Sequence, residues 1–178
     1  MKTKKLILSG LFAAIMALLA QVSIPLPFTP VPVTGQIFGV FLVSAILGGT
    51  WGAISILTYI LIGAVGFPVF SFAQGGLHIL LGPTGGYIWG FIPGSFLLGT
   101  FIEKRDSYFA MFLGMFLCLF AVYLLGALQL AFIAGLGLFQ VLLLGVLPFL
   151  PLDILKAVAA AGLSLSLRRR LLKAGLLP

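Results

Sequence analysis

One acidic and one basic side chain stand in a long stretch that is otherwise uncharged. Asp153 and Lys156 are the only charged residues between positions 108 and 167. Their spacing of three places both side chains on one face of a helix, within reach of each other. A charge inside a membrane costs about 2.5–3.5 kcal/mol on insertion scales and usually marks a functional site. The pair therefore predicts a ligand site, and a purely structural ion pair is the alternative.

Two other segments place glycine beside a polar side chain where a helix is expected to begin. Helix N-termini carry partial positive charge and free N–H groups, and glycine lets a ligand approach the backbone closely. A simple turn explains each segment equally well. With Lys156 as the cation and Asp153 as an acceptor, the set suits a small, mostly apolar anion that carries N–H donors. The candidate residues in these segments are Thr34, Gln36, Thr84, Gly85, Gly86 and Tyr87.

Two polar residues of an expected loop, Gln74 and His78, are candidates to cover such a ligand. Bracing of the loop is an equally good interpretation of each. His78 is the only histidine and Cys118 the only cysteine, which excludes an HExxH zinc site and an intramolecular disulfide. The sequence contains no P-loop motif and no evident nucleophile–base set, so it predicts neither an enzyme nor a cofactor or metal site.

The composition indicates what kind of fold positions these residues. Of the 178 residues, 62% are apolar and 7% are charged, whereas soluble proteins average about 45–50% and about 25%. This excludes an ordinary soluble domain, a disordered chain and a nucleic-acid-binding protein, although the net charge is +7. The sequence predicts an all-α integral membrane protein that forms one domain over residues 1–178.

Apolar segments separated by prolines, glycines or charges give six transmembrane helices. A spanning helix needs about 20 residues. Long outer loops then join the first helix to the second, at 25–33, and the third to the fourth, at 68–83. The segment 135–147 is expected to be an outer connection with room for a short interfacial or re-entrant helix. The predicted spans are residues 6–24, 34–47, 51–67, 84–102, 108–134 and 149–167.

The basic residues outside the last span form three groups, at positions 2–5, 104–105 and 168–173. Six spans place all three groups on one side of the membrane, and basic residues stay on the cytoplasmic side. Both termini are therefore expected in the cytoplasm, and a seventh span would place the last group outside. A cleaved signal peptide is an alternative for the N-terminus, but Leu18 fits a small-x-small cleavage site poorly.

Small residues recur every four positions along the first predicted helix, at Ser9, Ala13 and Ala17. Such a stripe lets two helices approach closely in lipid. It either packs within the bundle or meets another subunit. A similar glycine stripe, from Gly82 to Gly94, runs along the fourth predicted helix, where packing within the bundle is favoured.

Three segments together resemble the BioY family, the biotin-specific substrate-binding (S) components of energy-coupling factor (ECF) transporters. They are PFTPVPVTGQ at 27–36, GGLHILLGPTGGY at 75–87 and PLDILK at 151–156. The resemblance covers essentially the whole chain. The segment 71–74 and His78 depart from the family pattern, which leaves the loop contacts open.

The resemblance implies a subunit in the plasma membrane of a prokaryote that captures biotin at the extracellular face. It implies that a transmembrane coupling subunit and two cytosolic ATPases drive uptake, with Ala13 and Ala17 as the docking motif. Asp153 would accept hydrogen bonds from the ureido group of biotin, and Lys156 with a helix N-terminus would hold the carboxylate. The two roles can also be exchanged.

Two other classes of function fit the residues. In an ion-coupled secondary transporter of a small organic anion, Asp153 would carry a proton and no ATPase would be needed, but the internal repeats common in such transporters are not evident. In a structural or assembly protein, the Asp153–Lys156 pair would only link helices.

Overall fold

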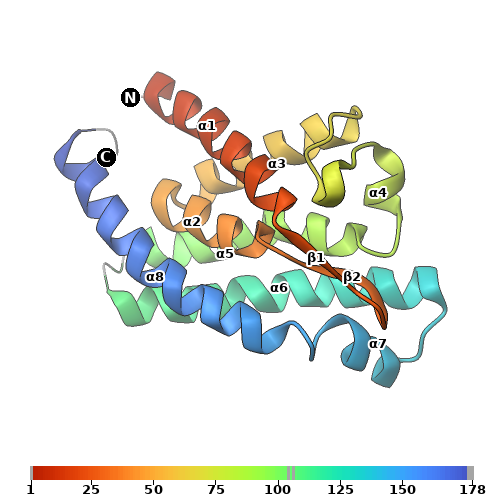
Figure 1. Cartoon of the computed structure of the whole chain (residues 1–178). Helices are drawn as coiled ribbons and strands as arrows, with labels where there is room; N and C mark the ends of the chain where they lie inside the picture. The colour runs from red at the N-terminus through yellow and green to blue at the C-terminus, as the bar shows by residue number, and fades with distance from the viewer. Residues whose placement is uncertain (1, 104, 106, 176–178) are drawn as a thin grey trace.

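The computed structural model describes residues 2–103, 105 and 107–175, and most of the chain is helical (Figure 1). This confirms the predicted helical class. The shorter elements are β1 (Ser23–Leu26), β2 (Thr29–Thr34), the 3₁₀ turn η1 (Ser71–Ala73), α4 (Leu77–Leu81) and α7 (Leu138–Gly145). The longer helices are α1 (Lys2–Gln21), α2 (Gln36–Leu47), α3 (Gly49–Ala64), α5 (Gly85–Glu103), α6 (Tyr108–Ala134) and α8 (Leu150–Lys173).

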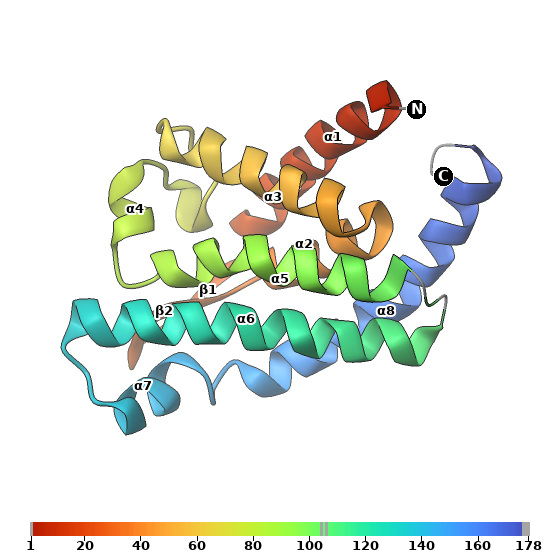
Figure 2. The ribbon, with the colours of Figure 1, turned by 180° about the vertical axis from the view of Figure 1, so that it is seen from behind.

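Helix α2 lies at the centre of the bundle. All of its residues except Phe38 are buried, as expected for a helix that is apolar on every side. It contacts α1, α3, α5 and α8, while α5 also packs along α3 and α6. Figure 2 shows α3, α5 and α6 side by side on one face of the molecule. Helix α2 is thus surrounded by the other helices.

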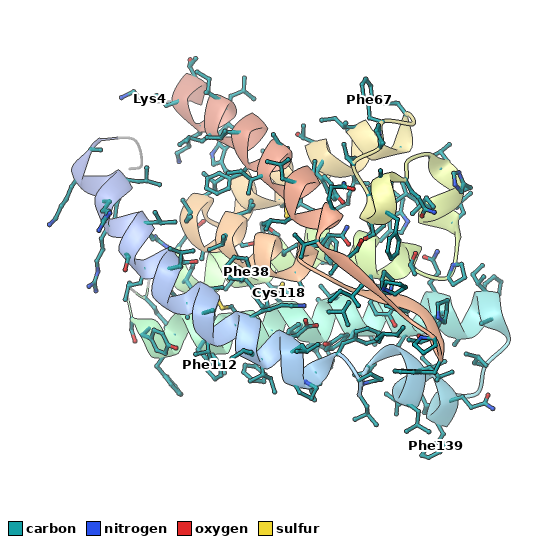
Figure 3. All side chains as sticks on the ribbon, viewed as in Figure 1. Lys4, Phe38, Phe67, Phe112, Cys118 and Phe139 are labelled. Carbon is teal, nitrogen blue, oxygen red and sulfur yellow. The ribbon has the colours of Figure 1, made fainter. Side chains whose placement is uncertain are left out.

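Four helices are long and apolar enough to cross a membrane within the described residues: α1 from Thr3, α5, α6 and α8. Helix α2 is shorter, and at 1.5 Å per residue it covers about 18 Å of a hydrocarbon core about 30 Å thick. Aromatic side chains such as Phe67 and Phe139 point away from the bundle (Figure 3) and are 61% and 73% exposed. An apolar outer surface of this kind suits lipid contact in a multi-pass membrane protein.

The helix bounds differ from the predicted spans mainly at the chain ends. Helix α1 begins at Lys2 instead of position 6, and α8 continues to Lys173 instead of ending at 167. Lys and Arg are good helix formers, so they end an apolar span without ending the helix. Helix α7 occupies the predicted connection at 135–147.

The first outer loop, predicted at 25–33, is part of a β-hairpin. Strands β1 and β2 pair in antiparallel fashion, with Ser23 opposite Thr34 and Leu26 opposite Thr29. Its prolines are compatible with this pairing because both strands of a two-stranded sheet are edge strands. Prolines indicate extended backbone, but they do not show whether two extended segments pair. Pairing depends on the register between the two segments, and this is why the hairpin was not predicted.

Both ends of the chain lie at the same end of the bundle, and the hairpin, α4 and α7 lie at the other (Figure 1). The Nζ atom of Lys4 donates a hydrogen bond to the main-chain oxygen of Gly175, 3.2 Å away. Lys104 of the predicted middle basic group and the neighbouring Asp106 lie outside the described residues.

The small-residue stripes of α1 and α5 both pack inside the bundle. A Cβ atom at Gly90 would lie 2.7 Å from the Cα atom of Val122 on α6, which confirms the favoured interpretation of the glycine stripe. On α1, Ser9 and Ala13 are each 2% exposed, and Ser9 accepts a hydrogen bond from Ser55 of α3. These two residues therefore offer no free surface to a partner in this conformation, and Ala17 is half-buried.

Candidate functional site

The charged pair predicted from the sequence forms at the start of α8. The Nζ atom of Lys156 lies 2.7 Å from Oδ1 of Asp153, and the two side chains are 22% and 9% exposed. Pro151, in the first turn of α8, is compatible with a helix start because its missing N–H would have no partner there. Asp153 lies in the same first turn and Lys156 in the next one, with both side chains on one face.

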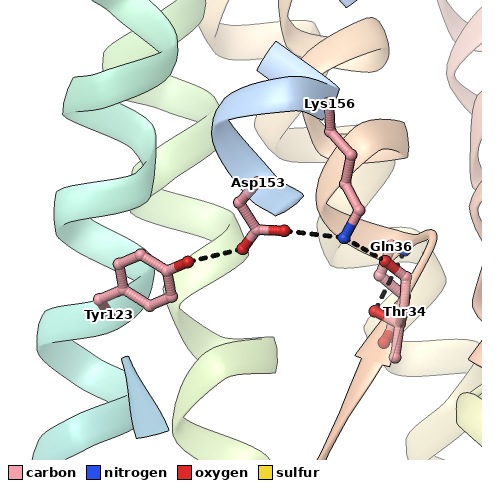
Figure 4. A network of polar contacts seen from close by, with 5 residues as sticks. All are labelled: Thr34, Gln36, Tyr123, Asp153 and Lys156. Atoms are coloured by element: carbon pink, nitrogen blue, oxygen red, sulfur yellow. Dashed lines mark hydrogen bonds and ion pairs between the residues drawn. The ribbon is translucent and has the colours of Figure 1, made fainter. Parts of the chain in front are cut away.

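A tyrosine of α6 completes the environment of the carboxylate. The hydroxyl of Tyr123 donates a hydrogen bond to Oδ2 of Asp153 at 2.6 Å (Figure 4). Each carboxylate oxygen of Asp153 thus has one donor, and a carboxylate has about four lone-pair sites. Asp153 can therefore still accept hydrogen bonds from a ligand.

Lys156 also connects α8 to the hairpin. Its Nζ atom donates a hydrogen bond to the main-chain oxygen of Thr34, 2.9 Å away (Figure 4). An ammonium group has three donors, and these contacts within the described residues use two of them. The third is free to meet an acceptor on a ligand.

Gln36 links three segments of the chain next to this pair. Its Nε2 donates to the hydroxyl of Tyr59 at 2.8 Å, and its Oε1 accepts from the Ser71 hydroxyl at 3.0 Å. The Gln36 main-chain N–H donates to Oγ1 of Thr34 at 3.3 Å. Gln36 therefore fixes the start of α2 against α3 and the loop at 65–76, and the residue is 5% exposed.

These residues open onto one cavity at the end of the bundle that carries the hairpin. Its volume is about 140 Å³, far above the roughly 10–15 Å³ that one water molecule needs on the same measure. It can therefore hold a small organic molecule. Of the residues predicted as ligand contacts, the structure brings seven to this cavity: Thr34, Gln36, Gln74, Thr84, Tyr87, Asp153 and Lys156.

Three helices begin at the cavity. Gln36 is the first residue of α2, Thr84 precedes α5, and Asp153 lies in the first turn of α8. All three line the cavity. The partial positive charge of these N-termini adds to that of Lys156, so the cavity favours an anionic ligand.

Tyr87 contributes its ring to the cavity while its hydroxyl is bound elsewhere. The hydroxyl donates to the main-chain oxygen of Gly145 at 2.9 Å, which ties α5 to the end of α7. The ring also packs against Gly126 of α6, where a Cβ atom would clash with it. Tyr87 therefore shapes the apolar wall instead of offering a free hydroxyl.

Three predicted contacts do not line the cavity. Gly85 and Gly86 pack closely against the main-chain oxygens of Leu80 and Leu125, so their lack of a side chain serves helix packing. His78 is exposed on α4 and is absent from the cavity wall. These glycines were predicted as ligand contacts because glycine lets a ligand approach the backbone. Glycine is equally suited to turns and to close helix packing, so its presence does not identify which neighbour it contacts.

The cavity also has contacts that the sequence patterns did not indicate. Tyr123 lies in the middle of an apolar helix. The only feature of the sequence that could have indicated its role is its hydroxyl, which needs a hydrogen-bond partner when it is buried. The remaining wall is mainly apolar and combines prolines of the hairpin with side chains of the helices. Among these residues are Pro30, Val31, Ile37, Phe70, Phe72, Ile79, Ile88, Phe91, Val122 and Phe149.

The loop over the cavity has strained backbone. Phe72 and Ala73 have φ values of 60° and 53°, in the left-handed region that favours glycine. Gln21 of α1 holds this loop: its Oε1 accepts from the Ala73 N–H at 2.9 Å, and its Nε2 donates to the Phe70 main-chain oxygen at 3.2 Å. The contacts from α1 therefore position Phe72 against the ligand space.

Sequence comparison places the chain among known proteins. The BioY family profile matches residues 1–173. The biotin transporter BioY of Thermotoga maritima is 41% identical over 167 residues, which is 93% of this chain and 96% of that protein. The biotin transporter BioY of Rhizobium etli is 39% identical, over 90% of this chain and 91% of that protein.

Structural comparison gives the same result. The fold matches a crystal structure of the S-component for biotin from an ECF-type ABC transporter with a TM-score of 0.88. The two chains are 29% identical, and the match covers 94% of this chain and 92% of the other.

Proposed function

The chain belongs to the BioY family, and on this premise we propose that it is the biotin-binding membrane subunit of an ECF transporter. The resemblance found in the sequence is confirmed, and the relatives are transporters and not enzymes. The observation that carries the proposal is the cavity in which the Asp153–Lys156 pair meets an apolar wall. Biotin combines a ureido group, an apolar bicycle and a carboxylate, and the cavity offers a partner for each.

The geometry of the pair favours one orientation of biotin. Lys156 Nζ and Asp153 Oδ1 are 2.7 Å apart, so one small polar group can contact both. A ureido group has a carbonyl oxygen next to an N–H, which matches an ammonium next to a carboxylate. We place the ureido group at this pair, and the carboxylate near Thr84, at the N-terminus of α5.

Calorimetric titration of the purified protein with biotin tests the function. Biotin is expected to bind, and 2-iminobiotin, in which the ureido oxygen is replaced by nitrogen, is expected to bind much more weakly. Biotin amide, which lacks the carboxylate charge, is expected to lose less affinity than iminobiotin does. If biotin does not bind, the proposed function is wrong. If biotin amide binds more weakly than 2-iminobiotin does, the carboxylate lies at the charged pair and the proposed orientation is reversed.

The ion-coupled alternative, with Asp153 as a proton site, has no observation in its favour. Both oxygens of Asp153 already accept hydrogen bonds from Lys156 and Tyr123. Uptake into cells that carry the complete ECF module distinguishes the two functions. Uptake that requires ATP and is unaffected by a proton uncoupler supports the ECF function. Uptake that is abolished by the uncoupler and does not require ATP supports the ion-coupled alternative.

We further propose six membrane crossings with both termini in the cytoplasm, α2 and α3 being the two shorter ones. The common position of the two chain ends and the basic residues beside them support this topology (Figure 1). Capture of biotin then takes place at the extracellular face, where the hairpin and α7 lie. In a Cys118→Ala background, Thr3→Cys is expected to react with an impermeant maleimide only after cell lysis, and Gly137→Cys in intact cells.

The energising partners are proposed to be a transmembrane coupling subunit and two cytosolic ATPases. Because Ser9 and Ala13 are buried, we place the docking face on the exposed side of α1, at Gly10 and Ala14. Small residues there allow a partner helix to approach closely. Ala14→Trp is expected to abolish ATP-dependent uptake and to leave biotin binding unchanged, whereas Leu18→Trp, a change from one large apolar side chain to another, serves as the control.

A further inference from the structure

A second cavity lies at the end of the bundle that carries the two termini. Its volume is about 420 Å³, and its walls include Lys5 of α1, Trp51 of α3, Glu103 of α5 and Arg168 of α8. Arg168 follows Asp153 by 15 positions on α8, which corresponds to about 22 Å along the helix. This cavity is therefore separate from the ligand site described above.

The described wall of this cavity carries a net charge of +1. Lys5 and Arg168 each contribute a positive charge, and Glu103 contributes a negative one. Oε1 of Glu103 accepts the Gly49 N–H at 2.9 Å, so this carboxylate is used to hold the break between α2 and α3. A single net positive charge suits a ligand with one negative charge.

Both cations are half-buried and keep donors for such a ligand. One guanidinium nitrogen of Arg168 donates to the Ala45 main-chain oxygen at 3.3 Å, which uses one of its five N–H donors. Nζ of Lys5 lies 6.0 Å from the centre of the Trp51 ring, a cation–π arrangement. Both side chains are thereby held beside the cavity.

Apolar side chains complete the same wall. Leu47 and Leu172 line the cavity with the cations, and Leu172 is 38% exposed. A free phosphate ion gains nothing from such a surface, whereas the acyl chain of a lipid does. Tryptophan beside basic residues is also typical of the boundary between lipid and water.

We propose that this cavity binds the phosphodiester head group of an anionic phospholipid. Lys5 and Arg168 contact the phosphate, and the chains of the lipid lie against the leucines. Basic pockets between helices on the cytoplasmic side bind anionic head groups in other membrane proteins. The proposal does not depend on the identity of the ligand in the first cavity.

The test uses Trp51 as a reporter in a Trp89→Phe background, since the chain has 2 tryptophans. The full chain in maltoside detergent is titrated with phosphatidylglycerol, phosphatidylcholine or glycerol 3-phosphate. A saturable change in Trp51 fluorescence is expected with phosphatidylglycerol, with binding at least about fivefold weaker for phosphatidylcholine and none for glycerol 3-phosphate. The proposal is overturned if phosphatidylcholine, or glycerol 3-phosphate, binds as tightly as phosphatidylglycerol does.

Variants in the same background identify the residues. Arg168→Gln is expected to weaken binding of phosphatidylglycerol about fivefold, Arg168→Lys to retain most of it, and Arg170→Gln, on the exposed side of α8, to leave it unchanged. If Arg168→Gln does not fold, Lys5→Gln takes its place. Unchanged lipid binding in the substituted protein overturns the proposal, and biotin titration of the same samples reports on the first cavity independently.

Discussion

The ammonium group of Lys156 donates a hydrogen bond to the main-chain oxygen of Thr34 at 2.9 Å, although the two residues are 122 positions apart. Thr34 ends the hairpin and Gln36 begins α2. The same ammonium group pairs with Asp153 at 2.7 Å. The charged pair and the hairpin over the cavity are therefore one connected unit, and a ligand that contacts Lys156 also acts on the hairpin.

Replacing Lys156 by Gln is expected to weaken biotin binding by about tenfold or more, because the ligand loses a charged donor worth about 1.5–3 kcal/mol. It is also expected to lower the free energy of unfolding by about 1–3 kcal/mol, since the nearly buried Asp153 carboxylate loses its partner. Calorimetry measures the first effect and thermal unfolding in detergent the second.

The double variant Asp153→Asn, Lys156→Gln separates a ligand contact from a structural link. With no charge left unpaired, its stability is expected to exceed that of the single Lys156→Gln variant. Biotin binding is expected to remain as weak as in the single variant. Wild-type affinity in the double variant would show that the pair only links helices.

Tyr123→Phe tests whether the tyrosine orients Asp153. Loss of the 2.6 Å hydrogen bond to Oδ2 leaves the carboxylate free to rotate, and affinity for biotin is expected to fall about tenfold, in line with about 1.5 kcal/mol for a hydrogen bond to a charged group. Tyr108→Phe is the matched control, because its hydroxyl also makes one bond, to the main-chain oxygen of Val158, but does not line the cavity. Equal affinities of the two variants would contradict this role.

Gly90→Ala tests the packing of α5 on α6. The new Cβ atom would meet the Cα atom of Val122 at 2.7 Å, and main chain cannot yield as a flexible side chain does. The expected loss of stability is about 1–3 kcal/mol. Gly10→Ala is the control: its Cβ meets no atom within 4 Å, and alanine raises helix stability by about 0.5–1 kcal/mol. Thermal unfolding of both variants measures the difference, and equal stabilities would contradict tight packing at Gly90.

The sequence predicted the helices and the charged pair because both depend on local patterns. Long apolar segments determine where the helices lie, and the spacing of Asp153 and Lys156 places both on one face. Contacts between distant segments were not predictable in this way. The hydrogen bonds of Lys156 to Thr34 and of Tyr123 to Asp153 depend on how α6, α8 and the hairpin pack, and no spacing along the chain encodes this.

The glycines and the α1 stripe show a different limit. Gly86 lies close to Leu125 of the neighbouring helix, and Ser9 and Ala13 face the inside of the bundle. Small residues allow close approach to any neighbour, whether a ligand, a partner subunit or a helix of the same chain. Their positions therefore predicted close contact correctly, but only the structure identifies the neighbour.

Ala73→Gly tests the strained loop over the cavity. Ala73 has a φ of 53°, a conformation that costs a residue with a side chain about 1–3 kcal/mol and costs glycine little. The substitution is therefore expected to raise the free energy of unfolding by about 1 kcal/mol. Thermal unfolding measures this, and Ala53→Gly, inside α3, is the control that is expected to lose about 0.5–1 kcal/mol.

Gln21→Ala removes the hydrogen bonds from α1 to this loop, namely those to the Ala73 N–H and the Phe70 main-chain oxygen. Hydrogen exchange at residues 70–74 is expected to become faster, because the loop loses its link to α1 while its strain remains. Biotin affinity is expected to fall with it, since Phe72 and Gln74 line the cavity. Unchanged exchange in Gln21→Ala would show that the loop is held by contacts other than those from α1, such as that of Ser71 to Gln36. A less stable Ala73→Gly protein would contradict the strain at Ala73.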